Sequence, residues 1–219
     1  MSTTPLTLSF AGQQPPIALP QVPGTRGPVG VDMRGLNQSG FCSYDPGFAN
    51  TAGCQSAISW IDTENSVLLH RGYPVDQLAR QCDFLEVAYI MLNGDAPDEA
   101  SYQTFRETIT RHTLVHEQIA RMCSGFRRDS HPMALMCALV GALAAFYHDV
   151  LDVENPQHRA LAATRLLSKM PTIAAMSYKY TIEQPAAYPR NDLSYAGNFL
   201  QMLFAIPAEK YVLNPVIEQ

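Results

Sequence analysis

The chain has 219 residues, of which 47% are hydrophobic and 16% are charged, and its formal net charge is -5. This balance excludes an intrinsically disordered chain, whose signature is low hydrophobicity with high net charge. It also argues against a nucleic-acid partner, because no basic surface is present to displace the counterions of a phosphate backbone.

The start of the chain and its cysteines bear on location. No basic residue precedes the apolar residues among the first ten, so a secretory signal is not expected. The longest uncharged apolar run, 132–147, is shorter than the roughly 20 residues that cross a membrane. The five cysteines are an odd number without metal-ligand spacing, which predicts reduced thiols and no metal site. We therefore expect a cytoplasmic protein with no membrane partner.

Residues 1–72 are expected to form a small β-rich N-terminal segment. Five prolines between residues 15 and 28 prevent a long helix there. Residues 56–62 alternate small or polar with apolar side chains, residues 63–66 are turn formers, and the apolar run resumes at 67–71. This pattern predicts a β-hairpin.

Residues 73–219 are expected to be helical, which makes the fold mainly α. After Pro74 the apolar residues recur with the period of a helix. Predicted helices cover 74–82, 84–92, a stretch from 97 that continues to 122, 133–147, 161–180 with a bend at Pro171, and 195–204. Asn214 and Pro215 are typical of a further helix start. Only four residues follow them, so we expect a fragment of a longer parent chain.

The histidines His112 and His116 have the spacing of a zinc-binding pair on a helix. A zinc protease, however, needs glutamate directly after the first histidine, whereas Glu117 follows the second. No third ligand is evident in the sequence. We therefore favour a structural role for the two histidines over a metal site.

Two basic residues, Arg165 and Lys169, lie four positions apart in a predicted helix. This spacing puts both side chains on one face, where they could hold two phosphate oxygens with charge-assisted hydrogen bonds. Such pairs more often lie on a solvated helix face, so both interpretations stay open. Gly24, Gly27 and Gly30 do not have the spacing of a dinucleotide-binding loop.

Seven segments carry a resemblance to a known family over almost the whole chain from about residue 35. They are FCSYDPGF (41–48), LLHRGYP (68–74), TRHT (110–113), HEQ (116–118), FRRDSHPM (126–133), GALAAFYH (141–148) and YPRNDLSYAGN (188–198). In this order they resemble citrate synthases of the bacterial, NADH-regulated type II branch. The resemblance implies the N-terminal half of that enzyme: a multi-helical fragment of its large domain behind the β-rich segment.

The resemblance also implies an activity. Citrate synthase is a transferase that condenses acetyl-CoA with oxaloacetate and water to citrate and CoA at the entry to the tricarboxylic acid cycle. It needs no catalytic cofactor and works as a dimer or hexamer of identical subunits. The family's catalytic histidines and aspartate lie beyond the matched segments. We therefore expect no catalytic residue in this chain, and no activity from it alone.

Two alternatives to this function remain open from the sequence. One keeps the fold and changes the acyl donor to propionyl-CoA, which gives 2-methylcitrate. The other is a non-catalytic chain that binds or assembles with a full-length copy of the enzyme.

Residues of an allosteric NADH site can also be carried over from the resemblance, with NADH as the inhibitor. The matching residues are Arg111, His112, Thr113, Tyr147, Arg165 and Lys169. Ala208 stands where relatives can have a reactive cysteine, and Leu114 where some have methionine. Thiol reagents are therefore not expected to report on this site, and tight NADH binding stays an open question.

Overall fold

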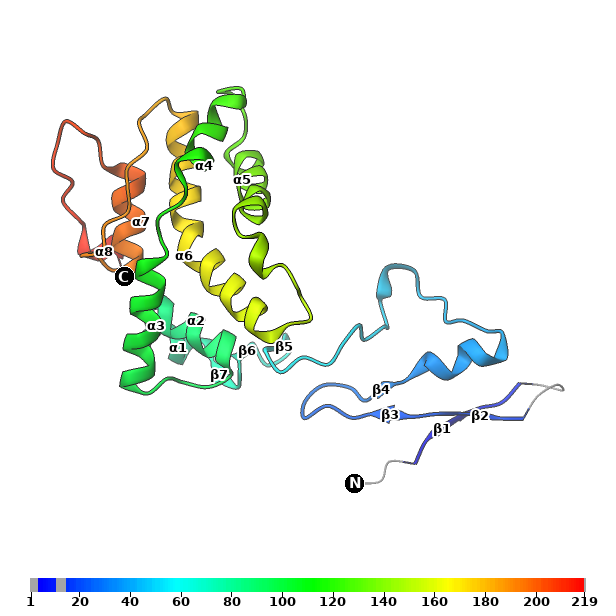
Figure 1. Cartoon of the computed structure of the whole chain (residues 1–219). Helices are drawn as coiled ribbons and strands as arrows, with labels where there is room; N and C mark the ends of the chain where they lie inside the picture. The colour runs from blue at the N-terminus through cyan, green and yellow to red at the C-terminus, as the bar shows by residue number, and fades with distance from the viewer. Residues whose placement is uncertain (1–3, 11–14, 219) are drawn as a thin grey trace. The chain divides into compact units, whose positions relative to one another are not determined.

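The computed structural model describes residues 4–10 and 15–218 (Figure 1), and the chain divides into two compact units, Met1–Pro74 and Val75–Gln219. The fold is mainly helical, with short antiparallel strands near the N-terminus, which confirms the predicted fold class. None of the helices in the described part is both long enough and apolar enough to cross a bilayer.

The first unit contains three small antiparallel sheets. Their strands are β1 (Leu6–Leu8) with β2 (Ile17–Leu19), β3 (Gln21–Val22) with β4 (Gly30–Val31), and β5 (Ser59–Asp62) with β6 (Val67–His70) and β7 (Tyr73–Pro74). The 3-10 helices Met33–Ser39 and Pro46–Phe48 lie between β4 and β5. Among the described residues of this unit, Leu19 and Leu36 are the buried apolar ones.

The pairing of β5 with β6 is the hairpin that the sequence predicts. Trp60 lies opposite Leu69 in its register. The carboxylate of Asp62 closes the turn by accepting hydrogen bonds from the backbone N–H groups of Glu64 and Asn65, at 3.1 Å each. An aspartate that folds back on the following backbone in this way favours a turn over a continued strand.

The second unit is built from eight α-helices among the described residues. They are α1 (Val75–Gln81), α2 (Phe84–Asn93), α3 (Glu99–Arg111), α4 (Glu117–Met122), α5 (Pro132–Phe146), α6 (Pro156–Thr181), α7 (Tyr195–Phe204) and α8 (Pro215–Glu218). The long helix α6 packs against both α5 and α7 and lies between them in Figure 1. Short 3-10 helices follow α4, at Cys123–Gly125, and α5, at His148–Val150.

The helix expected from residue 97 through residue 122 is interrupted. Helix α3 ends at Arg111, and α4 begins after His116, whose Nδ1 accepts a hydrogen bond from the backbone N–H of Gln118. The linker between them, residues 112–116, is held by side chains of α6 instead of by helix hydrogen bonds. The expectation that His112 and His116 share a helix face is therefore wrong.

Helix α6 begins at Pro156, ahead of the predicted Leu161, because the Asn155 side chain caps its first turn. Pro171 lies inside this helix and has no N–H to donate to the carbonyl of Leu167, four residues earlier. The hydroxyl of Tyr195, at the start of α7, donates to that carbonyl at 2.9 Å. The proline therefore creates an acceptor on which α7 is anchored.

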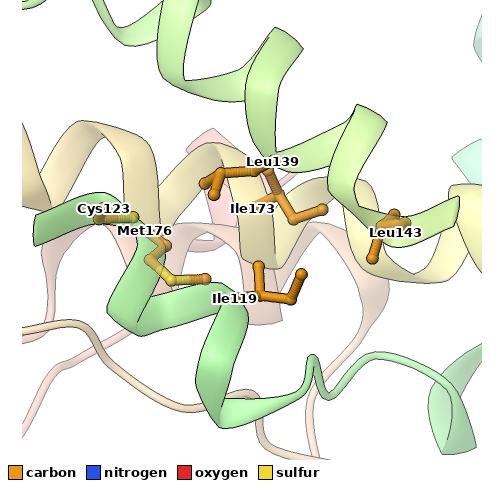
Figure 2. Close-up of a cluster of buried hydrophobic side chains, with 6 residues drawn as sticks. All are labelled: Ile119, Cys123, Leu139, Leu143, Ile173 and Met176. Atoms are coloured by element: carbon orange, nitrogen blue, oxygen red, sulfur yellow. The ribbon is translucent and has the colours of Figure 1, made fainter. Parts of the chain in front are cut away.

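The apolar core of the second unit lies where α4, α5 and α6 meet (Figure 2). Its buried members are Ile119, Cys123, Leu139, Leu143, Ile173 and Met176. One stripe of α5 supplies the leucines, whereas its opposite side leaves small residues and Met133 exposed. The core thus fixes α5 against α6 and thereby places the end of α5, Tyr147, beside α6.

Candidate anion-binding site

Two cations of α6 lie over one aromatic ring. Tyr147 forms the C-cap of α5, and the 3-10 helix that follows it, His148–Val150, packs against α6. The guanidinium carbon of Arg165 is 4.5 Å from the centroid of the Tyr147 ring, and Lys169 Nζ is 5.4 Å from it. Cations at this range are attracted to the negative face of the ring. We call Tyr147, Arg165 and Lys169 the Tyr147 cluster.

Lys169 is buried, with 3% of its surface exposed. Its ammonium donates to two backbone carbonyls of the α3–α4 linker, His112 O at 2.7 Å and Leu114 O at 2.5 Å. The hydroxyl of Thr172 donates to the carbonyl between them, Thr113 O, at 2.8 Å. Among the described residues, no carboxylate forms an ion pair with Lys169. Its charge is therefore compensated by carbonyl dipoles and the Tyr147 ring.

Arg165 has one acidic partner. Its Nη1 lies 3.5 Å from Oδ1 of Asp149, an exposed residue of the 3-10 helix after Tyr147. The geometry is that of an ion pair without a hydrogen bond, so the buried Nη1 has no hydrogen-bond acceptor within the described part of the chain. Nδ1 of His158, seven residues earlier on α6, is likewise buried without a hydrogen-bond partner among the described residues. A buried donor without an acceptor costs free energy, so Arg165 Nη1 is suited to donate to an oxygen atom of a bound ligand.

The electrostatic potential at the cluster is positive, and its effect appears in the pKa of His112. Burial lowers the pKa of the His112 imidazole, and the nearby charges of Lys169 and Arg165 lower it further. Among the described residues, the two cations have a single carboxylate partner, Asp149, so one positive charge here is balanced only by carbonyl dipoles and the Tyr147 ring. Such an arrangement favours a bound anion.

The structure brings together most, but not all, of the residues predicted for the NADH site. Tyr147, Arg165 and Lys169 form the cluster, and His112 and Thr113 contact α6 through their backbone carbonyls. The Thr113 hydroxyl itself donates to Thr110 O at 3.1 Å. Arg111 lies apart from the cluster: its exposed guanidinium pairs with Glu107 on α3 at 3.1 Å.

The sequence did not indicate that Asp149 or the linker carbonyls would contact the cluster, or that His158 would be buried nearby on α6 without a partner for Nδ1. His158 shares a helix face with Arg165 at seven-residue spacing, and this signal was available in the sequence. Asp149 follows Tyr147 by two residues, but only the 3-10 helix brings its carboxylate to Arg165. Backbone carbonyls carry no sequence signal at all.

Two cavities adjoin the linker. One of about 20 Å³ is lined by residues of α3, α6 and α7, including Thr113, Ser168 and Asn198, and has room for about one water molecule. The other, of about 60 Å³, is lined in part by His116 and Glu117, and the Tyr188 hydroxyl donates to Glu117 at 2.8 Å. Both are much smaller than a pocket for a dinucleotide. Neither cavity is lined by a residue of the Tyr147 cluster, so neither is a pocket for a ligand bound there.

Comparison with known proteins identifies the family. The family model described as the citrate synthase C-terminal domain matches residues 47–217. Citrate synthase from Pyrobaculum aerophilum is 28% identical with a TM-score of 0.67, over 73% of this chain and 42% of that one. The Thermotoga maritima enzyme is 25% identical with a TM-score of 0.64, over 78% and 43%.

A third structure shares the fold at lower identity. It is citrate synthase from Thermoplasma acidophilum, in a ternary complex with carboxymethyl coenzyme A and oxaloacetate. It is 23% identical with a TM-score of 0.67, and the match covers 74% of this chain and 42% of that one. The chain thus spans less than half the length of each of these structures. By its family match over 47–217, the chain belongs to the citrate synthase family.

Proposed function

We propose that this chain forms the N-terminal, large-domain part of a cytoplasmic citrate synthase, which condenses acetyl-CoA with oxaloacetate and water to citrate and CoA. The family match over 47–217 carries the citrate synthase assignment, and the order of the seven resembling segments supports the N-terminal, large-domain placement. The resemblance assigns the acid-base chemistry to histidines and an aspartate outside the matched segments, so no catalytic role is given to a residue of this chain.

A thiol-release assay with acetyl-CoA and oxaloacetate tests this proposal. It compares the 219-residue chain with the product of the same reading frame extended to the length of the related enzymes. We expect turnover from the extended protein and a rate equal to the buffer blank from the chain alone. Turnover by the purified chain would place catalytic residues within it. A preference of the extended protein for propionyl-CoA would identify a 2-methylcitrate synthase.

We further propose that the Tyr147 cluster holds the phosphates of NADH as an allosteric inhibitor. Two cations on one helix face, beside an aromatic ring and an unsatisfied buried N–H, support this role. An arginine fork and a lysine ammonium bind phosphate oxygens with charge-assisted hydrogen bonds. His112, Thr113 and Arg111 would complete the site, Arg111 after leaving its exposed partner Glu107.

Replacing Lys169 tests this site in the extended enzyme. Lys169→Ala should weaken NADH inhibition about 10- to 150-fold, the equivalent of one hydrogen bond to a charged group, with little change in oxaloacetate affinity. Lys210→Ala is the matched control, because it removes the same charge from an exposed position. Far-UV circular dichroism checks that both variants fold. Unaltered inhibition of the Lys169 variant would remove this residue from the site.

Finally, we propose that the chain's partner is a second copy of itself. The exposed side of α5, which contains Ala134, Cys137, Gly141 and Ala144, supports this role because its small side chains allow close helix approach. Sedimentation velocity of the chain across a concentration series tests it. A monomer at every concentration would contradict self-association.

A further inference from the structure

Both cations of the Tyr147 cluster are already engaged by the chain itself, but in different ways. Lys169 is held by neutral carbonyls that also fix the α3–α4 linker. Arg165 is faced by a carboxylate, that of Asp149. The side chain of Arg165 is 18% exposed and that of Asp149 is 63% exposed. A mostly buried cation thus meets an acid that has ready access to water.

The contact between Arg165 and Asp149 is an incomplete one. At 3.5 Å, without hydrogen-bond geometry, it leaves the buried Nη1 of Arg165 unsatisfied. An ion pair at this distance with an exposed carboxylate contributes little to stability, because the released Asp149 carboxylate regains its hydration. A phosphate oxygen at normal hydrogen-bond distance would satisfy the donor that Asp149 leaves without an acceptor.

We propose that Asp149 is an autoinhibitory carboxylate, which occupies Arg165 in the place of a phosphate and opposes anion binding at the Tyr147 cluster. This inference rests on the anion-binding role proposed above. Carboxylate and phosphate are both oxyanions that fit the arginine fork, so they compete for it. The negative charge of Asp149 also repels an approaching phosphate within a screening length of about 10 Å. Removing the charge of Asp149 should therefore tighten anion binding in two ways, by freeing the arginine fork and by ending the repulsion.

Calorimetric titration of the chain with inorganic pyrophosphate, and separately with NADH, tests the proposal. Asp149→Asn keeps the size of the side chain and removes its charge. We expect it to tighten the binding of both ligands about three- to tenfold, the range of a weak ion pair with added repulsion. Glu183→Gln is the matched control, since Glu183 is an exposed carboxylate that pairs with Arg128 at 3.9 Å. The last residue of α6, Thr181, lies 16 residues after Arg165, which the helix rise converts to about 24 Å, and Glu183 follows Thr181 by two residues. The control should stay within twofold of the unaltered chain.

A double variant shows whether the gain acts through Arg165. Arg165→Gln in the Asp149→Asn background should abolish the gain, and a gain that persists would make the effect one of general charge and overturn the inference. If the unaltered chain binds NADH and Asp149→Asn binds it equally or more weakly, Asp149 orients Arg165 instead of competing for it. The inference then fails while the anion site stands. If neither form shows saturable binding of either ligand, both the anion site and the inference fail.

Discussion

Helix α6 is held in two different ways on the two sides of Pro171. After the proline, Ile173 and Met176 pack into the apolar cluster of α4 and α5. Before it, Arg165 and Lys169 engage a ring, a carboxylate and backbone carbonyls. Apolar packing is non-directional, whereas a buried polar contact depends on every partner. The apolar part therefore fixes the fold, and the polar part is where we expect the proposed anion to act.

The contrast is not absolute, because a second buried lysine lies in the later part of α6. Lys179 donates to Ala205 O at 2.6 Å and to Gln184 Oε1 at 2.7 Å, and burial lowers its pKa. It joins the end of α6 to the end of α7. Both buried lysines of α6, Lys169 and Lys179, thus hold neighbouring loops by donating hydrogen bonds to carbonyl oxygens.

The largest expected effect is in the apolar part. Leu139→Ala removes a side chain that is fully buried in the cluster, and it should lower the free energy of unfolding by about 2–5 kcal/mol. Urea unfolding followed by circular dichroism measures it. Met133→Ala, on the exposed side of the same helix, should change stability by less than about 0.5 kcal/mol. Equal effects from the two variants would mean that α5 does not pack through its leucine stripe.

The next effect is in the polar part. Lys169→Met leaves the carbonyls of His112 and Leu114 without their donor, at a cost of about 1–3 kcal/mol each. Removing a desolvated charge offsets part of that cost, so we expect a net loss of about 2 kcal/mol. Amide hydrogen exchange should also accelerate in the α3–α4 linker. Exchange that stays slow there would show that Lys169 is not what holds the linker.

Arg111→Gln is the reference for Lys169→Met, because it removes an exposed charge from α3. Arg111→Gln breaks only a solvated pair with Glu107, and it should cost no more than about 0.5 kcal/mol without any change in linker exchange.

The sequence predicted the apolar part of the fold well. The sequence located α2, α5 and α7 almost to the residue, because each is a run of apolar residues at helical spacing or apolar throughout, and each begins at a capping residue such as Asp83 or Ser194. The break between α3 and α4 was missed. Its apolar residues continue the helical period, and the interruption comes from Lys169 and Thr172, more than fifty positions away in the sequence. A contact at that separation leaves no local pattern.

The candidate site was only partly predictable for a similar reason. The spacing of Arg165 and Lys169 predicted a shared face, and the resemblance supplied Tyr147 beside it. Neither indicated that Lys169 would be buried on carbonyl oxygens or that Asp149 would face Arg165. These features depend on where the chain turns after Tyr147.

A smaller effect tests the boundary between the two parts, at Pro171. Tyr195→Phe leaves the Leu167 carbonyl without its donor and should cost about 1 kcal/mol. In a Pro171→Ala background the restored helix N–H takes that carbonyl, so the same change should cost much less. A double-mutant cycle measured by urea unfolding gives the coupling. Full additivity would show that the proline and the tyrosine act independently.

The smallest effect is a pH dependence that arises at His112. Its folded-state pKa lies below the ordinary 6.5 because of burial and then because of Lys169 and Arg165, so the folded state favours the neutral ring. The stabilising effect of that neutral ring is present above pH 6.5 and is lost as the pH falls through the lowered value, since the unfolded chain takes up its proton first.

Lys169→Met removes one of the two charges, so the pKa of His112 should rise part of the way towards 6.5, while burial keeps it from returning fully. An NMR titration of the imidazole, assigned with His112→Gln, measures this shift, and Lys210→Ala should leave it unchanged. A bound anion beside His112 would raise the same pKa, so the NMR titration repeated with saturating sulfate, whose charge is constant over this pH range, should give a higher His112 pKa; an unchanged pKa would separate His112 from the anion site.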